Sequence, residues 1–145
     1  MRRLYEALKT DDAETAQRIL APDLEWWFHG PPAYRHCLMS FLTADSTQTK
    51  QFSFSPQSVT ALGNKVVVEG HEDESVYWIH VWTVDENGIV TQVREYFNTS
   101  LVVMDFKPVS TSPSVGRRQV GCSLIWQSEF GHSDDKSMPG LLLPI

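Results

Sequence analysis

Four polar residues with the chemistry of a ligand site lie close together in the stretch VYWIHVWTVDENGIVTQVREYFNT, residues 76–99. His80 can give or take a proton near neutral pH, and Arg94 can bind an anion. The hydroxyl of Tyr96 and the amide of Asn98 can hydrogen-bond a carbonyl or a carboxylate. Such groups indicate either a pocket or a core in which the polar side chains satisfy one another.

Two apolar runs in this stretch, residues 76–84 and 89–99, flank a turn and predict a β-hairpin. Side chains alternate across a strand, so Trp78, His80 and Trp82 share one face of the first run, and Ile79 and Val81 share the other. Both faces are largely apolar, so we expect both to be covered. Helices can cover one face, which leaves the other for a partner subunit or the C-terminal segment. The sequence therefore predicts a homodimer through the sheet.

The length of the turn decides which residue of the second run lies opposite His80. A two-residue turn, Asn87-Gly88, places Glu95 there, whereas a three-residue loop over 86–88 places Arg94 there. A shift of one residue in the pairing of the two strands moves every side chain of the second run to the other face. The turn residues suit both alternatives, so this reasoning leaves the register open.

The rest of the chain predicts the elements that must position these residues. Apolar positions at helical spacing between residues 4 and 20 predict two helices, the second capped by Asp11 or Asp12. A strand over 24–29 and a short helix over 34–43 follow, and from Phe52 onward a period of two predicts a four-stranded meander. Helices on one face of a mostly antiparallel sheet make an α+β domain. We expect this core over residues 1–104, with an extension over 105–145 that packs on or near it.

Composition excludes several classes of function. The net charge of −6 and the pI near 5.2 argue against a nucleic-acid partner. No N-terminal apolar region or stretch of about 20 apolar residues occurs, so we expect a cytoplasmic protein without a membrane partner. Cys37 and Cys122 form no C-x-x-C motif and are expected to be free thiols. The acids and histidine of 71–74 lie across a predicted turn, so we expect no metal and no cofactor.

The segments LEWWFHGPP, IHVWTVDENGIVTQVREYFNT and KSMPGLLLPI resemble the plant wound-induced protein 1 family. This family is part of the SnoaL-like branch of the nuclear transport factor 2-like superfamily. The resemblance implies a curved, mostly antiparallel sheet wrapped around N-terminal helices to form a cone with a pocket, often dimerising through the outer sheet face. It also implies an association with wounding, stress and senescence.

The resemblance favours the second register, and it implies a pocket lined by five residues of the hairpin: Trp78, His80, Arg94, Tyr96 and Asn98. Trp27 and His29, just before the turn Gly30-Pro31-Pro32, become further pocket candidates by analogy with enzymatic relatives. Those relatives often carry an aspartate at the position of Asn98. An amide cannot accept a proton at neutral pH, which argues against a general base there and against an enzyme.

Three functions follow as hypotheses. The first is a stress-responsive dimer whose apolar cone binds a small hydrophobic or aromatic molecule with one polar head. The second is an isomerase, cyclase or hydratase with His80 as general base, and the third is a protein-interaction module that uses the outer sheet face. A hydrogen-bonded pair of His80 with a carboxylate would favour the enzyme. Lack of an internal cavity would favour the interaction module.

Overall fold

The computed structural model describes residues 1–10, 12–43, 52–73, 75–108, 120–129 and 141–145. The chain divides into two compact units, Met1–Asn98 and Thr99–Ile145. The domain boundary predicted between residues 104 and 105 therefore falls inside strand β6 (Leu101–Pro108), the first strand of the second unit.

The helices of the first unit form where the spacing of apolar residues predicts them. Helix α1 (Arg2–Lys9) buries its apolar positions, and α2 (Ala13–Gln17) begins at Asp12, whose side chain accepts a hydrogen bond from the Thr15 N–H. Asp11, the other predicted cap, lies outside the described residues. The predicted helix over 34–43 is a 3-10 turn, η1 (Pro32–Tyr34), followed by α3 (Cys37–Leu42).

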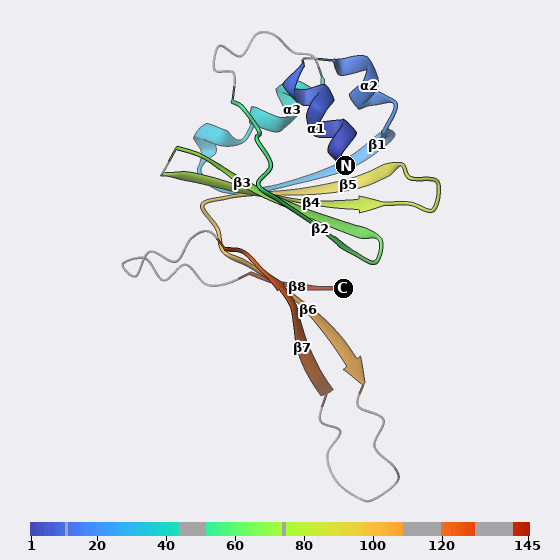
Figure 1. Ribbon diagram of the computed structural model, residues 1–145, viewed down its shortest axis with the longest axis vertical. Coiled ribbons are helices and arrows are strands. Elements are labelled where there is room, and N and C mark those ends of the chain that lie inside the picture. The colour runs from blue at the N-terminus through green and yellow to red at the C-terminus, as the bar shows by residue number, and fades with distance from the viewer. Residues whose placement is uncertain (11, 44–51, 74, 109–119, 130–140) are drawn as a thin grey trace, which may run out of the picture. The chain divides into compact units, whose positions relative to one another are not determined.

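A five-stranded sheet forms the other layer of this unit, in the order β1-β5-β4-β3-β2. The predicted meander is confirmed as β2 (Ser58–Leu62), β3 (Lys65–Glu72), β4 (Val76–Val84) and β5 (Val90–Phe97). Strand β1 (Leu20–His29) adds to the edge, parallel to β5. The helices lie on one face of this sheet (Figure 1), and the predicted α+β class is confirmed.

The hairpin between β4 and β5 combines features of both predicted registers. Asp85 and Ile89 share a hydrogen bond and Gly88 has a φ of 82°, as in a three-residue loop. An irregularity follows at once: Val84 pairs with Val90 but Thr83 pairs with Gln92. Thr91 is thus an extra residue, a β-bulge, and beyond it the pairing is that of the two-residue turn.

The core of the first unit lies between the helices and the inner sheet face, which we define as the face that carries Trp78, His80 and Trp82. Aromatic rings dominate it, with Tyr5 of α1 stacked on Trp78 and Phe54 packed edge-on against the same indole. The opposite, outer face carries Ile79 and Val81, which are also buried. The prediction that both faces of β4 are covered is confirmed.

The second unit is a small sheet of three strands in the order β7-β6-β8. Strand β6 pairs antiparallel with β7 (Val120–Gln127) and parallel with β8 (Leu141–Pro144). The apolar segments CSLIWQ and LLLP of the sequence, residues 122–127 and 141–144, lie in β7 and β8.

Candidate functional site

The predicted pocket residues do not share one face of the sheet. Trp78 and His80 lie on the inner face and are fully buried. Arg94 pairs with Val81 and Tyr96 pairs with Ile79, so both point to the outer face. The register favoured by the resemblance, with Arg94 opposite His80, is therefore wrong. The physical reason is the bulge, which shifts every later residue of β5 by one position.

Four of the predicted residues instead form a group on the outer face. In the parallel pairing of β1 with β5, Trp27 lies beside Arg94 and His29 beside Tyr96. The His29 ring stacks on Tyr96 with centroids 5.1 Å apart. Burial raises the pKa of the Tyr96 hydroxyl, and the Arg94 guanidinium, which hydrogen-bonds it, opposes that rise. These four side chains cannot line a pocket together with His80.

Asn98 has a local structural partner. Its side-chain Oδ1 accepts a hydrogen bond from the Tyr77 N–H at 3.1 Å, and its own N–H donates to the Tyr77 carbonyl at 2.9 Å. Its φ of 50° lies in the left-handed region, which asparagine tolerates better than most residues. Asn98 therefore ends the β4–β5 ladder and anchors the chain at that point.

A chain of hydrogen bonds runs through the core on the inner face, and we call it the relay. Its five members, in order, are Trp82, Tyr5, His80, Glu95 and Trp26. The Trp82 indole Nε1 donates to the Tyr5 hydroxyl at 3.0 Å, and that hydroxyl lies 2.6 Å from His80 Nδ1. His80 Nε2 lies 3.4 Å from Glu95 Oε1, and the Trp26 Nε1 donates to Glu95 Oε2 at 3.0 Å.

The donors of the relay fix the proton positions in it. An indole N–H can only donate, so the Tyr5 oxygen accepts from Trp82. Among the described residues His80 Nδ1 is the acceptor within reach of the buried hydroxyl proton, so we assign that proton to the bond with Nδ1. Burial raises the pKa of the Tyr5 hydroxyl well above its usual range, which keeps that proton in place. His80 Nδ1 is then an acceptor, so the ring carries its proton on Nε2 and donates it to Glu95. Every hydrogen bond of the relay points toward the Glu95 carboxyl group.

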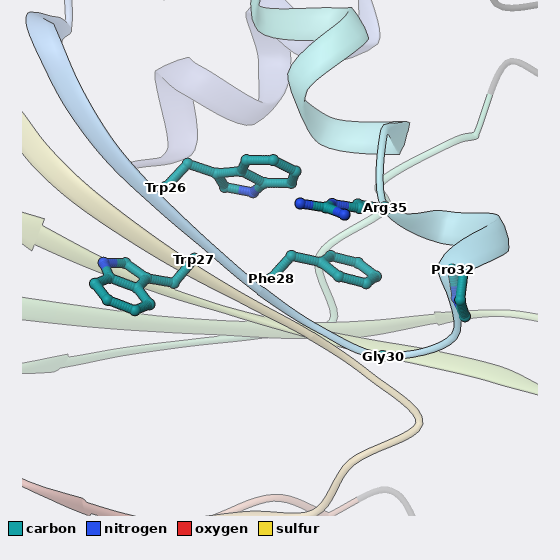
Figure 2. A pocket seen from close by; sticks show the side chains of 6 residues that line it. All are labelled: Trp26, Trp27, Phe28, Gly30, Pro32 and Arg35. Carbon is teal, nitrogen blue, oxygen red and sulfur yellow. The ribbon is translucent and has the colours of Figure 1, made fainter.

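A cleft of about 460 Å³ opens beside the Trp26 end of the relay. Six residues line it, and we call it the aromatic cleft: Trp26, Trp27, Phe28, Gly30, Pro32 and Arg35. Figure 2 shows the side chains of Trp26, Phe28 and Arg35 on one side of β1 and that of Trp27 on the other. The guanidinium group of Arg35 points toward the space between the two rings on its side. Trp26 thus belongs both to the cleft and to the relay.

A second cleft of about 790 Å³ lies at the ends of the β2–β3 and β4–β5 turns, with Met1, Ile19 and Glu86 among its lining. None of the predicted site residues lines it. In the part of the chain that the structure describes, no three metal-ligating side chains come together, and Cys37 and Cys122 form no disulfide. No helix of the described segments is long and apolar enough to cross a membrane.

Of the relay, the sequence predicts His80 as a site residue but not its hydrogen-bond partners. Glu95 entered only as one of two register alternatives, and Tyr5 was hidden among the apolar positions of α1. The signal that was available for Tyr5 is a hydroxyl on the buried face of an amphipathic helix, which must find a partner there. Arg35 carried no local signal beyond its place after the turn at Pro31-Pro32.

Comparison with solved structures shows the fold. A SnoaL-like protein of unknown function from Burkholderia thailandensis superimposes with a TM-score of 0.51 and 11% identity, over 66% of this chain and 89% of that one. TerC, co-crystallised with polyporic acid, gives a TM-score of 0.51 and 20% identity, over 66% and 85% of the two chains. The fold is therefore that of the SnoaL-like and nuclear transport factor 2-like proteins, as the resemblance implied.

Comparison with known sequences shows the family. Senescence associated gene 20 of Arabidopsis thaliana is 43% identical over 107 residues, which cover 69% of this chain and 93% of that protein. Wound-induced protein 1 of Solanum tuberosum is 39% identical over 95 residues, 65% of this chain and 87% of that one. The model of the family described as Wound-induced protein WI12 matches residues 39–145. The chain belongs to this wound-induced, senescence-associated plant family.

Proposed function

We propose that this protein binds a small aromatic molecule that carries an anionic group, and that the aromatic cleft is its binding site. The observation that carries the proposal is the presence of Trp26, Phe28 and the guanidinium of Arg35 in one cleft. The family match begins at residue 39, so the proposal rests on residues of this chain and not on the family. It moves the expected ligand from the interior of the cone to a cleft at the edge of the sheet.

The size and lining of the cleft suit a compound of one to three aromatic rings. Its volume of about 460 Å³ lies within the range of about 300–1,000 Å³ that is usual for small-molecule sites. Trp26 and Phe28 have ring centroids 6.1 Å apart and planes inclined at 45°. Their rings are neither fully buried nor fully exposed, so a planar ligand can gain apolar contact and ring stacking against them.

The charge of the site selects the ligand's polar group. Among the described residues that line the cleft, Arg35 alone carries a charge, and the described residues offer its guanidinium no carboxylate partner. A guanidinium beside aromatic walls binds carboxylates and sulfonates through paired N–H donors. The chain as a whole has a net charge of −6, so attraction of an anion depends on this local contact and not on the overall field.

The proposal is tested with two fluorescent probes that differ in charge. Anilinonaphthalene sulfonate is an anion with three aromatic rings, a naphthalene and an anilino ring, and phenylnaphthylamine is the same skeleton without the sulfonate. We expect the anionic probe to bind wild-type protein, and Arg35→Gln to weaken its binding about tenfold, which corresponds to about 1.4 kcal/mol. Binding of the neutral probe should change less than twofold, because Arg35→Gln leaves the aromatic walls in place.

Arg18→Gln is the matched control, because it removes an exposed arginine that pairs with Glu14 on α2 and does not line the cleft. It should leave both probes unaffected. An equal loss in the Arg18 and Arg35 variants would show that the probe responds to net charge alone. An unchanged affinity of Arg35→Gln for the anionic probe would refute the assignment of the cleft.

A second candidate function is acid–base catalysis, and one observation favours it. A hydrogen-bonded pair of His80 with a carboxylate is the feature expected of an enzyme, and His80 Nε2 does lie 3.4 Å from Glu95 Oε1. Because His80 already holds its Nε2 proton toward Glu95, the carboxylate is the base of this pair and His80 orients it. The reaction class is removal of a proton from a carbon acid.

This candidate is tested with nitrobenzisoxazole, a planar aromatic carbon acid. A carboxylate base takes the C–H proton, the electron pair forms the nitrile, and the N–O bond breaks to leave a coloured cyanonitrophenolate. Catalysis by wild-type protein that is lost in Glu95→Gln would support the enzyme. Equal rates for wild type, Glu95→Gln and free carboxylate buffer would remove it.

A further inference from the structure

Trp26 joins two features of the molecule that are otherwise separate. Its ring lines the aromatic cleft, while its Nε1 donates to Glu95 Oε2 at 3.0 Å. A ligand that packs on this indole therefore changes the position of a group that is hydrogen-bonded to the buried core. Glu95 is fully buried, so its Oε2 has no water to replace a weakened bond from Trp26.

The hydrogen bonds of the relay converge on Glu95, so a change at this carboxyl group reaches both arms of the relay. Each donor points toward Glu95, from Trp82 through Tyr5 and His80 on one side and from Trp26 on the other. Hydrogen bonds in such a chain polarise one another inside a low-dielectric core. A change in the hydrogen bond from Trp26 to Glu95 therefore alters the strength of the hydrogen bond between His80 and Glu95. That change in turn alters the strength of the hydrogen bond between Tyr5 and His80.

Tyr5, the member of the relay that joins His80 to Trp82 at the far end, lies on helix α1. Tyr5 belongs to the buried face of this eight-residue helix, together with Leu4, Ala7 and Leu8. A helix of this length has little stability of its own and depends on its tertiary contacts. The Tyr5 hydroxyl supplies a directional contact among these apolar ones, because it bonds both His80 and Trp82. The packing of α1 on the sheet thus includes a hydrogen-bonded contact, the Tyr5 hydroxyl, that the relay connects to the aromatic cleft.

We propose that Glu95 is a positioning residue of the aromatic cleft, and that the relay transmits occupancy of the cleft from Trp26 to Tyr5 on α1. The inference rests on the proposed function, since it needs a ligand that contacts Trp26. In the free protein Glu95 holds the indole of Trp26 as a wall of the site. When a ligand binds, the same bond carries the change through His80 to the helix that covers the inner sheet face.

The test reads the indole N–H groups of the tryptophans by ¹H–¹⁵N NMR, with anilinonaphthalene sulfonate as the ligand. Trp26 is in the cleft and Trp82 is fully buried and does not line it, so the two signals report the two ends of the relay. We expect the probe to shift both signals in wild-type protein. In Tyr5→Phe the Trp26 signal should still shift, and the response of Trp82 should be lost.

Glu95→Gln is a second variant, useful if Tyr5→Phe folds poorly. The amide oxygen can still accept from Trp26, but its NH₂ group faces the N–H of His80, so the relay is cut between these two residues. We again expect a Trp26 response without a Trp82 response. A Trp82 response that persists in either variant, or that is missing in wild type while Trp26 shifts, overturns the relay alone. If neither Trp26 nor Trp27 responds, the cleft is not the site, and the proposed function fails together with the inference.

Discussion

Replacement of Tyr5 by phenylalanine removes one oxygen atom from the centre of the relay. The hydroxyl accepts from Trp82 Nε1 and donates to His80 Nδ1, so its loss leaves two ring nitrogens without a partner. Both rings are fully buried, so water cannot take the place of the hydroxyl. The aromatic ring of residue 5 and its stacking on Trp78 are retained.

The magnitude follows from this count of orphaned groups. A buried donor or acceptor that loses its partner costs about 1–3 kcal/mol, so two of them cost about 2–6 kcal/mol. The hydroxyl no longer has to be desolvated, which offsets part of this cost and leaves a net loss of about 2–4 kcal/mol. Domains of this size have total stabilities of about 5–15 kcal/mol, so the loss is large but compatible with folding.

Urea unfolding measures the loss, with Tyr34→Phe as the matched control. Tyr34 also stacks in the core, with its centroid 4.9 Å from that of Phe97, but no hydrogen bond of its hydroxyl occurs among the described residues. Its variant should change stability by less than about 0.5 kcal/mol. With a slope of about 2 kcal/mol per molar urea, Tyr5→Phe should lower the midpoint by about 1–2 M. Equal midpoints for the two variants would refute the reasoning that the Tyr5 hydroxyl satisfies both rings.

Three further predictions test the fold. In Gly70→Ala the new Cβ would lie 2.5 Å from the Ser55 carbonyl oxygen and 2.6 Å from Cζ2 of Trp78, so we expect urea unfolding to show a loss of about 1–3 kcal/mol. Gly63→Asn, in open space at a φ of 58°, should cost less than about 1 kcal/mol. The backbone N–H of residue 89 donates to Asp85 and lowers the pKa of its carboxyl group from the ordinary 3.8. The carboxylate therefore stabilises the fold above pH 3.8 and loses this contribution as the pH falls through the lower pKa of the folded state. The difference in stability between wild type and Asp85→Asn should shrink in acid, and a difference that stays constant contradicts this.

The layers of the first unit were predictable because they follow from short-range patterns. Apolar spacing predicted α1 and α2, and period-two runs predicted the meander from β2 to β5. The start of β1 was not predicted, because Pro22 suggested only the end of a helix. Proline is tolerated in an edge strand, and β1 lies at the edge of the sheet with an irregular register between Leu20 and Glu25.

The register of the β4–β5 hairpin could not be predicted from sequence patterns alone. The loop itself, with Gly88 in the left-handed region, is the predicted three-residue loop over residues 86–88. The bulge at Thr91 then reverses the consequence, and it has no comparable signal in the local sequence. Its cause is packing: the shift places Val93, Glu95 and Phe97 on the inner face, where all three are fully buried. The register of β5 beyond the bulge is set by burial of its side chains, and the residues of the turn take no part in that burial.

The site was less predictable than the fold, because its members come from distant parts of the chain. Tyr5 and His80 are 75 residues apart, and Trp26 and Glu95 are 69 apart. Alternation along β4 placed His80 correctly on the face with Trp78 and Trp82. The identity of its partners depends on how α1 and β1 pack against that face, and no spacing rule gives this arrangement.

The same geometry ranks binding above catalysis. A general base must come within about 3 Å of the proton it removes, yet both oxygens of Glu95 already accept hydrogen bonds, one from Trp26 and one from His80. His80 and Glu95 are 0% exposed, so a substrate can reach the carboxylate only if Trp26 moves aside. Binding in the aromatic cleft needs no such movement, because Arg35 and the ring of Trp26 already face it. Trp26→Phe separates the two functions: without the indole N–H, Glu95 Oε2 loses a hydrogen-bond partner, so elimination of nitrobenzisoxazole should become faster if Glu95 is a gated base. An unchanged rate, with the sulfonate probe still bound, would leave Glu95 with a positioning role alone.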